Sequence, residues 1–122
     1  MDRSIDELRN EISEVEKYYR ILKDYLVGAE LSIVEVRGCL HSLKEYLSKV
    51  RVSLFDIMLA KIGKKVNLPI DDLLDKIDLA LILIESNPQQ ARLIIQTALT
   101  LSSIKIEDIV ASLGFLKKIL SP

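Results

Sequence analysis

Apolar residues recur along the first half of the chain with the seven-residue spacing of a coiled-coil seam. When Ile5 is taken as heptad position a, the a positions up to Leu54 and the d positions from Leu8 to Ile57 are all apolar or aromatic. A seven-residue repeat of this length is typical of helices that bury one narrow face against another helix. The pattern therefore predicts helical structure over residues 4–62.

The same residues are compatible with one long helix or with a helical hairpin. Gly28 is suited to the end of a helix, and Ser32 with Glu35 three residues later has the spacing of an N-terminal capping box. The Ser-x-x-Glu spacing also occurs inside the pattern, at Ser13 and Ser42, and an arbitrary loop would shift the heptad phase. We therefore favour a single helix of about 85 Å and keep a hairpin near residues 28–32 as the alternative.

A helix of that length predicts an assembly, because one chain of 122 residues is too short to cover it. We expect a homodimer or a higher homo-oligomer that buries the seam. An antiparallel pair is preferred, since acidic residues dominate the first 16 positions and basic residues dominate 37–65. The expected interface consists of Ile5, Leu8, Ile12, Val15, Tyr19, Leu22, Leu26, Ile33, Leu40, Leu43, Leu47 and Val50.

The second half of the chain predicts three shorter helices, over 68–86, 88–103 and 105–120. The boundary between the first two is marked by Asn87, which can cap a helix, and by Pro88, which suits a first helical position. The predicted fold class is therefore all-α. A long N-terminal coiled-coil-forming helix, or a helical hairpin, and three shorter helices form a helical bundle in a single domain over 1–122.

Cysteine content and apolar runs predict a cytoplasmic protein. Cys39 is the one cysteine, so the chain has no internal disulfide. The first residues are charged and lack the apolar stretch of a signal peptide. No charge-free apolar run reaches the roughly 20 residues that a membrane-spanning helix needs, and no membrane contact is expected.

Few residues of the sequence are suited to catalysis or metal binding. With one histidine and one cysteine, zinc sites and carboxylate-histidine metal bundles are excluded. The acids between Asp71 and Asp78 are conceivable ligands for an oxygen-coordinated ion, but acids are also favoured at a helix N-terminus. We therefore predict no catalytic residue, no metal and no cofactor.

The charges are segregated although they nearly cancel, with 17 Lys and Arg against 18 Asp and Glu. Arg37, Lys44 and Arg51 recur at heptad position e and form a basic row beside the seam. Such a row can follow a nucleic-acid backbone. We expect it instead to pair with acids of the same assembly, either those of 71–78 or those of the first turns.

One short motif offers an enzymatic alternative. The segment Arg37-Gly-Cys-Leu-His41 resembles the Arg-x4-6-His element of HEPN-type helical RNases and toxins, although three residues separate Arg from His here. The resemblance implies that Arg37 stabilises phosphate charge and that His41 acts as acid and base in a dimeric site. The alternative is an ordinary surface pair between His41 and Glu45, which lie one helical turn apart.

Together these observations predict a non-enzymatic helical interaction or scaffold protein, or an accessory subunit, that acts through oligomerisation with a protein partner of unknown identity. The first alternative is an accessory protein that binds nucleic acid through the row of Arg37, Lys44 and Arg51. The second alternative is a HEPN-like RNase or toxin component that uses Arg37 and His41.

Overall fold

The structure, a computed structural model, describes residues 2–61, 70–101 and 118. All elements in these residues are helical, and none is a strand. The expected all-α helical bundle is therefore confirmed. The elements are α1 (Asp2–Leu26), α2 (Ile33–Lys61), α3 (Ile70–Leu83), α4 (Pro88–Gln96) and a π-helical continuation η1 (Thr97–Leu101).

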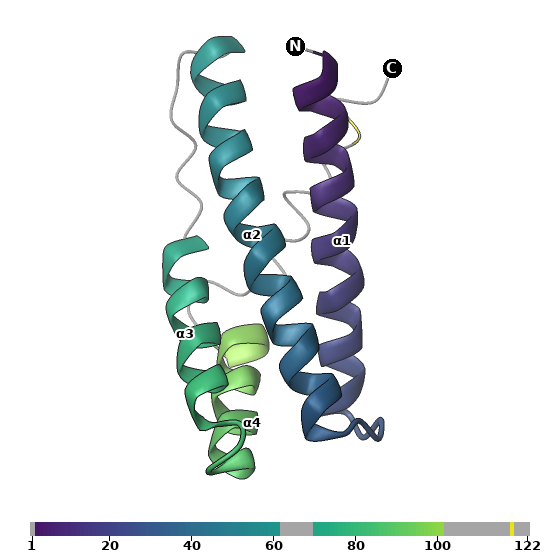
Figure 1. Cartoon of the computed structure of the whole chain (residues 1–122), viewed down its shortest axis with the longest axis vertical. Helices are drawn as coiled ribbons and strands as arrows, with labels where there is room; N and C mark the ends of the chain where they lie inside the picture. Colours follow the sequence, from purple (N-terminus) through teal and green to yellow (C-terminus); the bar gives the residue numbers. More distant parts are fainter. Residues whose placement is uncertain (1, 62–69, 102–117, 119–122) are drawn as a thin grey trace.

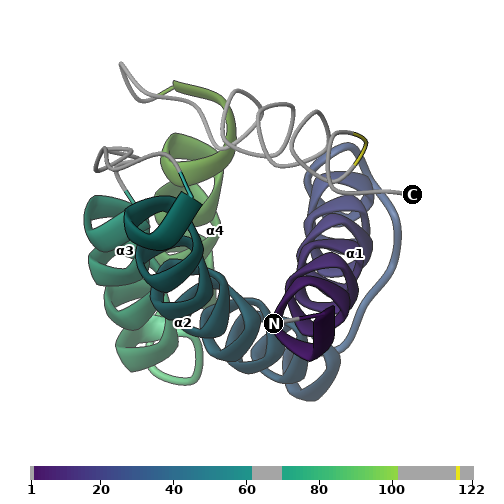
Figure 2. The ribbon, with the colours of Figure 1, turned by 90° about the horizontal axis from the view of Figure 1, so that it is seen from above.

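The helices form two consecutive hairpins that share one core. Helices α1 and α2 run antiparallel along the length of the molecule, and α3 lies beside the N-terminal half of α2 (Figure 1). Seen from above, the four helices follow one another around an arc, with α1 and α4 at its ends (Figure 2). Leu22 of α1, Leu43 of α2, Ile77 of α3 and Ile95 of α4 line one apolar cavity of only about 10 Å³. The four helices are thus closely packed around a common centre.

The preference for one long helix is wrong, because the chain reverses direction at residues 27–32. Gly28 has a φ of 119°, a conformation that L side chains rarely adopt, and this ends α1. Ser32 starts α2 with a capping box. Its Oγ accepts a hydrogen bond from the Glu35 backbone N–H at 3.1 Å, while its own N–H donates to Glu35 Oε1 at 3.5 Å. The hairpin alternative is confirmed.

The heptad pattern misses this turn because the turn preserves the heptad phase. Leu26 near the end of α1 and Ile33 at the start of α2 both occupy position a, and the six residues between them complete one repeat. Burial reveals the break that the spacing conceals. Leu26 is only partly buried, Ala29 is exposed and Ile33 is 44% exposed, although all three belong to the seam by sequence.

The predicted seam is buried within one chain, as the contact between α1 and α2. The two helices cover these side chains within one chain, as an intramolecular core, and their role at a subunit interface stays a prediction. The side chain of Ile5 lies outside the described part of the chain. Those buried in the core are Leu8, Ile12, Val15, Tyr19, Leu22, Leu40, Leu43, Leu47 and Val50.

The second hairpin follows the predicted boundaries closely. The Asn87 side chain caps α4 by accepting a hydrogen bond from the Gln90 backbone N–H at 3.2 Å, and Pro88 is the first residue of that helix. The helix predicted over 68–86 is α3, and the one over 88–103 is α4 with η1. The helix predicted over 105–120 falls outside the described residues, apart from the helical Lys118.

Arg92 of α4 joins the two hairpins at the end of α1. Its Nη2 donates to the carbonyl oxygens of Tyr25 at 3.3 Å and Leu26 at 3.1 Å, and its guanidinium lies 4.8 Å from the centre of the Tyr25 ring. These carbonyls belong to the last turn of α1, where acceptors lack intrahelical partners and a positive charge is favoured. The contact therefore caps one hairpin with a side chain of the other.

The two glycines of the first hairpin should respond oppositely to alanine. We expect Gly28→Ala to lower the free energy of unfolding by about 1 kcal/mol or more, because alanine is strained at positive φ. Gly38 lies inside α2 with nothing within 4 Å of an added Cβ, so Gly38→Ala should raise it by about 0.5–1 kcal/mol. Urea unfolding of both variants measures the two effects. Unchanged stability in Gly28→Ala would contradict the described turn, and a loss of stability in Gly38→Ala would contradict the open helical position of Gly38.

Candidate interaction surface on helices α2 and α3

Three ion pairs connect α2 to α3 and the turn that follows it. Arg37 pairs with Glu85, Lys44 Nζ lies 2.5 Å from Asp78 Oδ1, and Arg51 pairs with Asp71. We call these six residues the ion-pair ladder. The three cations are those of the predicted basic row, and their partners include the acids of 71–78 that the sequence suggested for them.

The ladder follows directly from antiparallel packing. Each step of seven residues along α2, from 37 to 44 to 51, is matched by a step of seven residues backwards, from 85 to 78 to 71. Because seven residues make two helical turns, all three pairs recur on the same side of the contact. Side chains of the ladder are about two-fifths to three-quarters exposed, so each pair contributes roughly 0.2–1 kcal/mol.

The ladder changes the interpretation of the basic row as a nucleic-acid contact. Each of the three cations contacts a carboxylate of its own chain, so the row does not present an unopposed positive surface. Phosphate binding would have to compete with these pairs. Binding of nucleic acid through Arg37, Lys44 and Arg51 stays a prediction that this geometry does not favour.

Next to the ladder, α3 carries a second set of residues on its outer side. Asp72, Asp75, Leu79 and Ile82 are spaced by three, four and three residues, which places them along one face of a helix. Both aspartates are exposed, Leu79 is 46% exposed and Ile82 is 73% exposed. We call these four residues the outer α3 stripe. It lies opposite the buried face of α3, which consists of Ile70, Leu73, Leu74, Ile77 and Ala80.

This stripe is not among the expectations drawn from the sequence, which give the bounds of a helix over 68–86 without dividing its residues between two faces. The signal was present, because Leu79 and Ile82 do not share the spacing of the buried residues and continue the spacing of two aspartates instead. A helix with aliphatic residues on both sides is typical of an element with two contact surfaces.

Exposed aliphatic side chains also occur on α2 and α4. Val34 and Val52 of α2 are 65% and 57% exposed, and Leu93 of α4 is 56% exposed. None of the three belongs to the buried face of its helix. The described part of the molecule therefore exposes aliphatic surface on three of its four helices.

The two residues of the HEPN-like motif lie one turn apart on α2. Arg37 is engaged with Glu85 in the ladder. His41 is exposed, and within the described part of the chain it has no hydrogen-bond or ion-pair partner, Glu45 included. Glu45 pairs instead with Lys49, whose Nζ lies 3.2 Å from Glu45 Oε1. The structure brings Arg37 and His41 to one side of α2, where the Glu85 carboxylate opposes the positive charge that the motif would direct at a phosphate.

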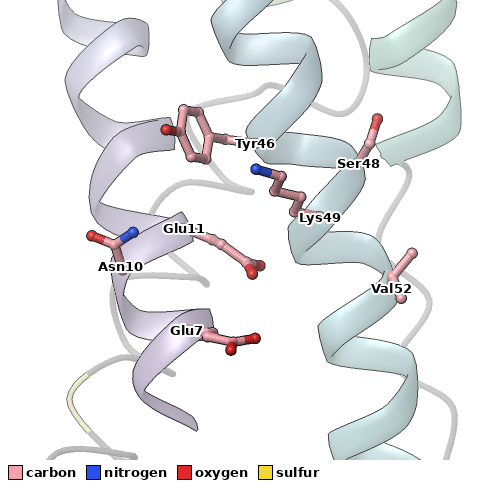
Figure 3. A pocket seen from close by; sticks show the side chains of 7 residues that line it. All are labelled: Glu7, Asn10, Glu11, Tyr46, Ser48, Lys49 and Val52. Carbon is pink, nitrogen blue, oxygen red and sulfur yellow. The ribbon is translucent and has the colours of Figure 1, made fainter. Parts of the chain in front are cut away.

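An open pocket of about 640 Å³ lies between α1 and the second half of α2 (Figure 3). Figure 3 shows Glu7 and Glu11 of α1 on one side and Lys49 of α2 on the other. Glu11 is buried to 8% exposure, and Lys49 Nζ lies 5.1 Å from the centre of the Tyr46 ring. Acidic side chains lie on one wall and a basic one on the other, although most of the lining surface is apolar. The Ser48 hydroxyl, which also lines the pocket, donates a hydrogen bond to the Lys44 carbonyl oxygen at 2.8 Å.

Cys39 lies half-buried on α2, at the margin of the core. Burial raises the pKa of its thiol, because the charged thiolate loses solvation, and the nearby charge of Glu35 raises it further. Lys17 acts in the opposite direction and only partly offsets these effects. The thiolate required for nucleophilic chemistry is therefore disfavoured at neutral pH.

Neither a metal centre nor a membrane-spanning helix occurs in the described residues. No three His, Cys, Asp or Glu residues are grouped there so as to hold an ion. Asp71 and Asp78, considered above as ligands, are engaged with cations of α2. Of the helices that the structure describes, none has the length and apolarity to cross a membrane.

The ion-pair ladder can be tested by exchanging its charges. Lys44→Glu should lower the free energy of unfolding by about 1 kcal/mol, because an attraction to Asp78 becomes a repulsion. The double variant Lys44→Glu/Asp78→Lys should recover most of the loss, and 1 M salt should shrink both effects. Arg20→Glu is a matched control, since Arg20 has no ion-pair partner among the described residues. A double variant as unstable as Lys44→Glu would contradict the pairing.

The environment of Cys39 predicts a displaced pH profile for its reaction with a disulfide reagent. We expect the midpoint of rate against pH to lie above the ordinary thiol value in the folded chain and to fall in urea, since only the folded state buries the thiol. Glu35→Gln should lower the folded midpoint, because it removes a negative charge while its side-chain amide oxygen can still accept the hydrogen bond from the Ser32 backbone N–H. The same midpoint in folded and unfolded chains would show that burial does not act on Cys39.

Comparisons with protein-family models, curated proteins and solved structures find no match to this chain. The surface and core described above are therefore the basis for a functional assignment. The combination they offer is a closed helical core and an outer face that carries both aliphatic and charged side chains.

Proposed function

We propose that this protein is a non-enzymatic helical interaction module that binds other helices through its outer surface. The observation that carries the proposal is the exposure of aliphatic side chains on helices whose buried faces are already complete. Ile82 of α3 is 73% exposed, Val34 of α2 is 65% exposed and Leu93 of α4 is 56% exposed. Transfer of such side chains from water into an interface is favourable by about 25 cal/mol per Å².

The internal use of the heptad seam supports this choice of surface. Leu22, Leu43 and Leu47 are fully buried within the chain, so contact with another molecule through them would require the hairpin to open. The outer aliphatic residues are available without any rearrangement. The outer surface can bind a second copy of this chain, which would give the expected homo-oligomer, or it can bind a different protein.

Chemical features of the chain support a non-enzymatic role. Arg37 is held by Glu85, His41 stands exposed, and the raised pKa of Cys39 disfavours its thiolate. An acid–base or nucleophilic site requires several such groups in contact. We assign the module to the cytoplasm, where a lone cysteine stays reduced.

Photo-crosslinking in the native cell tests the proposal. A photoreactive amino acid is placed at Ile82 or at Leu93, and in matched controls at Ser13 or Arg20 of α1, which are exposed and polar and lie on a helix without an exposed large aliphatic side chain in the described residues. We expect the aliphatic positions to give a reproducible adduct with one defined protein, or with a second copy of this chain. The polar positions should give little or none, because they are remote from an aliphatic contact.

The yields of crosslinked adduct at the four positions distinguish specific binding from random encounter. Equal adducts at aliphatic and polar positions would indicate random encounter, and no adduct at either aliphatic position would overturn the proposed module. Circular dichroism of each variant confirms the helical fold before the crosslinks are compared. All four positions lie on the surface, so substitution there should leave the core intact.

A further inference from the structure

The acids of α3 fall into two groups that differ in their partners. Asp71 and Asp78 face α2 and pair with Arg51 and Lys44. Asp72 and Asp75 are exposed, and within the part of the chain that the structure describes they have neither a hydrogen-bond nor an ion-pair partner. The negative charge of the outer α3 stripe is thus not balanced by the contact that places α3 in the bundle.

The outer α3 stripe combines this charge with aliphatic surface in a fixed order. The N-terminal half of the stripe carries Asp72 and Asp75, and its C-terminal half carries Leu79 and Ile82. From the first to the last of these residues the stripe spans about 15 Å, since each residue advances a helix by 1.5 Å. A single helix lying along α3 can contact all four side chains, because i, i+3 and i+7 residues face one side.

The charge pattern restricts what can lie there. An anionic lipid surface or a nucleic-acid backbone would bring further negative charge to Asp72 and Asp75. A second α3 in parallel would oppose acids with acids, and in antiparallel orientation it would cover each acid with Leu79 or Ile82. A helix that places cations beside Asp72 and Asp75 and aliphatic residues beside Leu79 and Ile82 complements both the charged and the aliphatic half of the stripe.

We infer that the outer α3 stripe is a docking site for a basic amphipathic helix of another protein. This inference rests on the proposed interaction function and specifies the partner's chemistry. Lysine or arginine side chains of the partner pair with Asp72 and Asp75, and its leucine or isoleucine side chains pack on Leu79 and Ile82. The aliphatic contact supplies affinity, and the charges select the partner and its alignment.

Binding of designed helical peptides to the full chain tests the inference. The probe is a fluorescent peptide of about five helical turns, with leucine at the central a and d positions and lysine at the outer ones, so that it fits in either orientation. A second peptide has glutamate for lysine, and a third has serine for leucine. We expect saturable binding of the basic peptide, at least about tenfold tighter than that of either control, and weaker at 0.5 M salt.

Charge exchange in the protein provides the decisive comparison. Asp72→Lys/Asp75→Lys should reverse the preference, so that the glutamate peptide binds at least about tenfold tighter than the lysine peptide. The control Asp24→Lys/Glu30→Lys changes the net charge equally at exposed acids of α1 and the turn, and should keep the original preference. Equal binding of the two peptides by the native chain, no saturable binding, or reversal by both variants would overturn the inference.

The aliphatic half is tested separately. Leu79→Gln/Ile82→Gln should weaken the basic peptide at least about tenfold, whereas Leu93→Gln on α4 should leave its affinity within about twofold. Equal loss in both would place the contact elsewhere and overturn the inference. The proposed interaction function is tested independently of this inference, because crosslinks at Ile82 or Leu93 can persist even if the basic peptide does not bind.

Discussion

Burial of the aliphatic seam between α1 and α2 is the constraint on which the other features of this fold depend. Leu8, Val15 and Leu22 of α1 and Leu40 and Leu47 of α2 are almost completely removed from solvent. Once the two helices cover each other, one flank of α2 remains for α3, and the position of α3 determines where α4 can pack. The surface outside this core is what the described helices leave exposed to solvent.

The segregation of charge gives that packing its direction. Cations of the ladder all lie on α2 and their partners all lie on α3 or directly after it. Exposed pairs of this kind stabilise little, but like charges in contact are unfavourable, so the arrangement disfavours pairing of α2 with α2 or of α3 with α3 between copies. Register along the contact is determined in addition by the buried residues, for example Ile77 and Ala80.

Local signals in the sequence predict the helices and their buried faces well, whereas contacts between distant residues are predicted only in part. Helical content, the cap at Asn87 and the buried seam follow from spacing and from residue type. The reversal at Gly28 was present only as an alternative, because the step across its turn, from Leu26 to Ile33, is one heptad. The contact of Arg92 with the end of α1 joins residues 67 positions apart and has no local signature.

The candidate surface shows the same division between local and distant information. Pairing of the basic row with acids of 71–78 was one of two expectations. The seven-residue spacing of Arg37, Lys44 and Arg51 is matched by that of Asp71 and Asp78. Glu85 as the third partner was not foreseen, because it lies beyond the predicted acidic segment. The outward position of Ile82 could have been derived from spacing alone, once the buried face of α3 was known.

The phase-preserving turn has a consequence for how this chain can evolve. Because residues 27–32 complete one heptad, a chain with a straightened turn would align the same seam residues in one continuous stripe, ready to exchange arms with a second copy. Few residues determine which of these two states forms. They are chiefly Gly28, through its backbone freedom, and Ser32 and Glu35, through their capping box. Substitution at such hinges is a short route from a folded-back chain to an arm-exchanged dimer with an unchanged core.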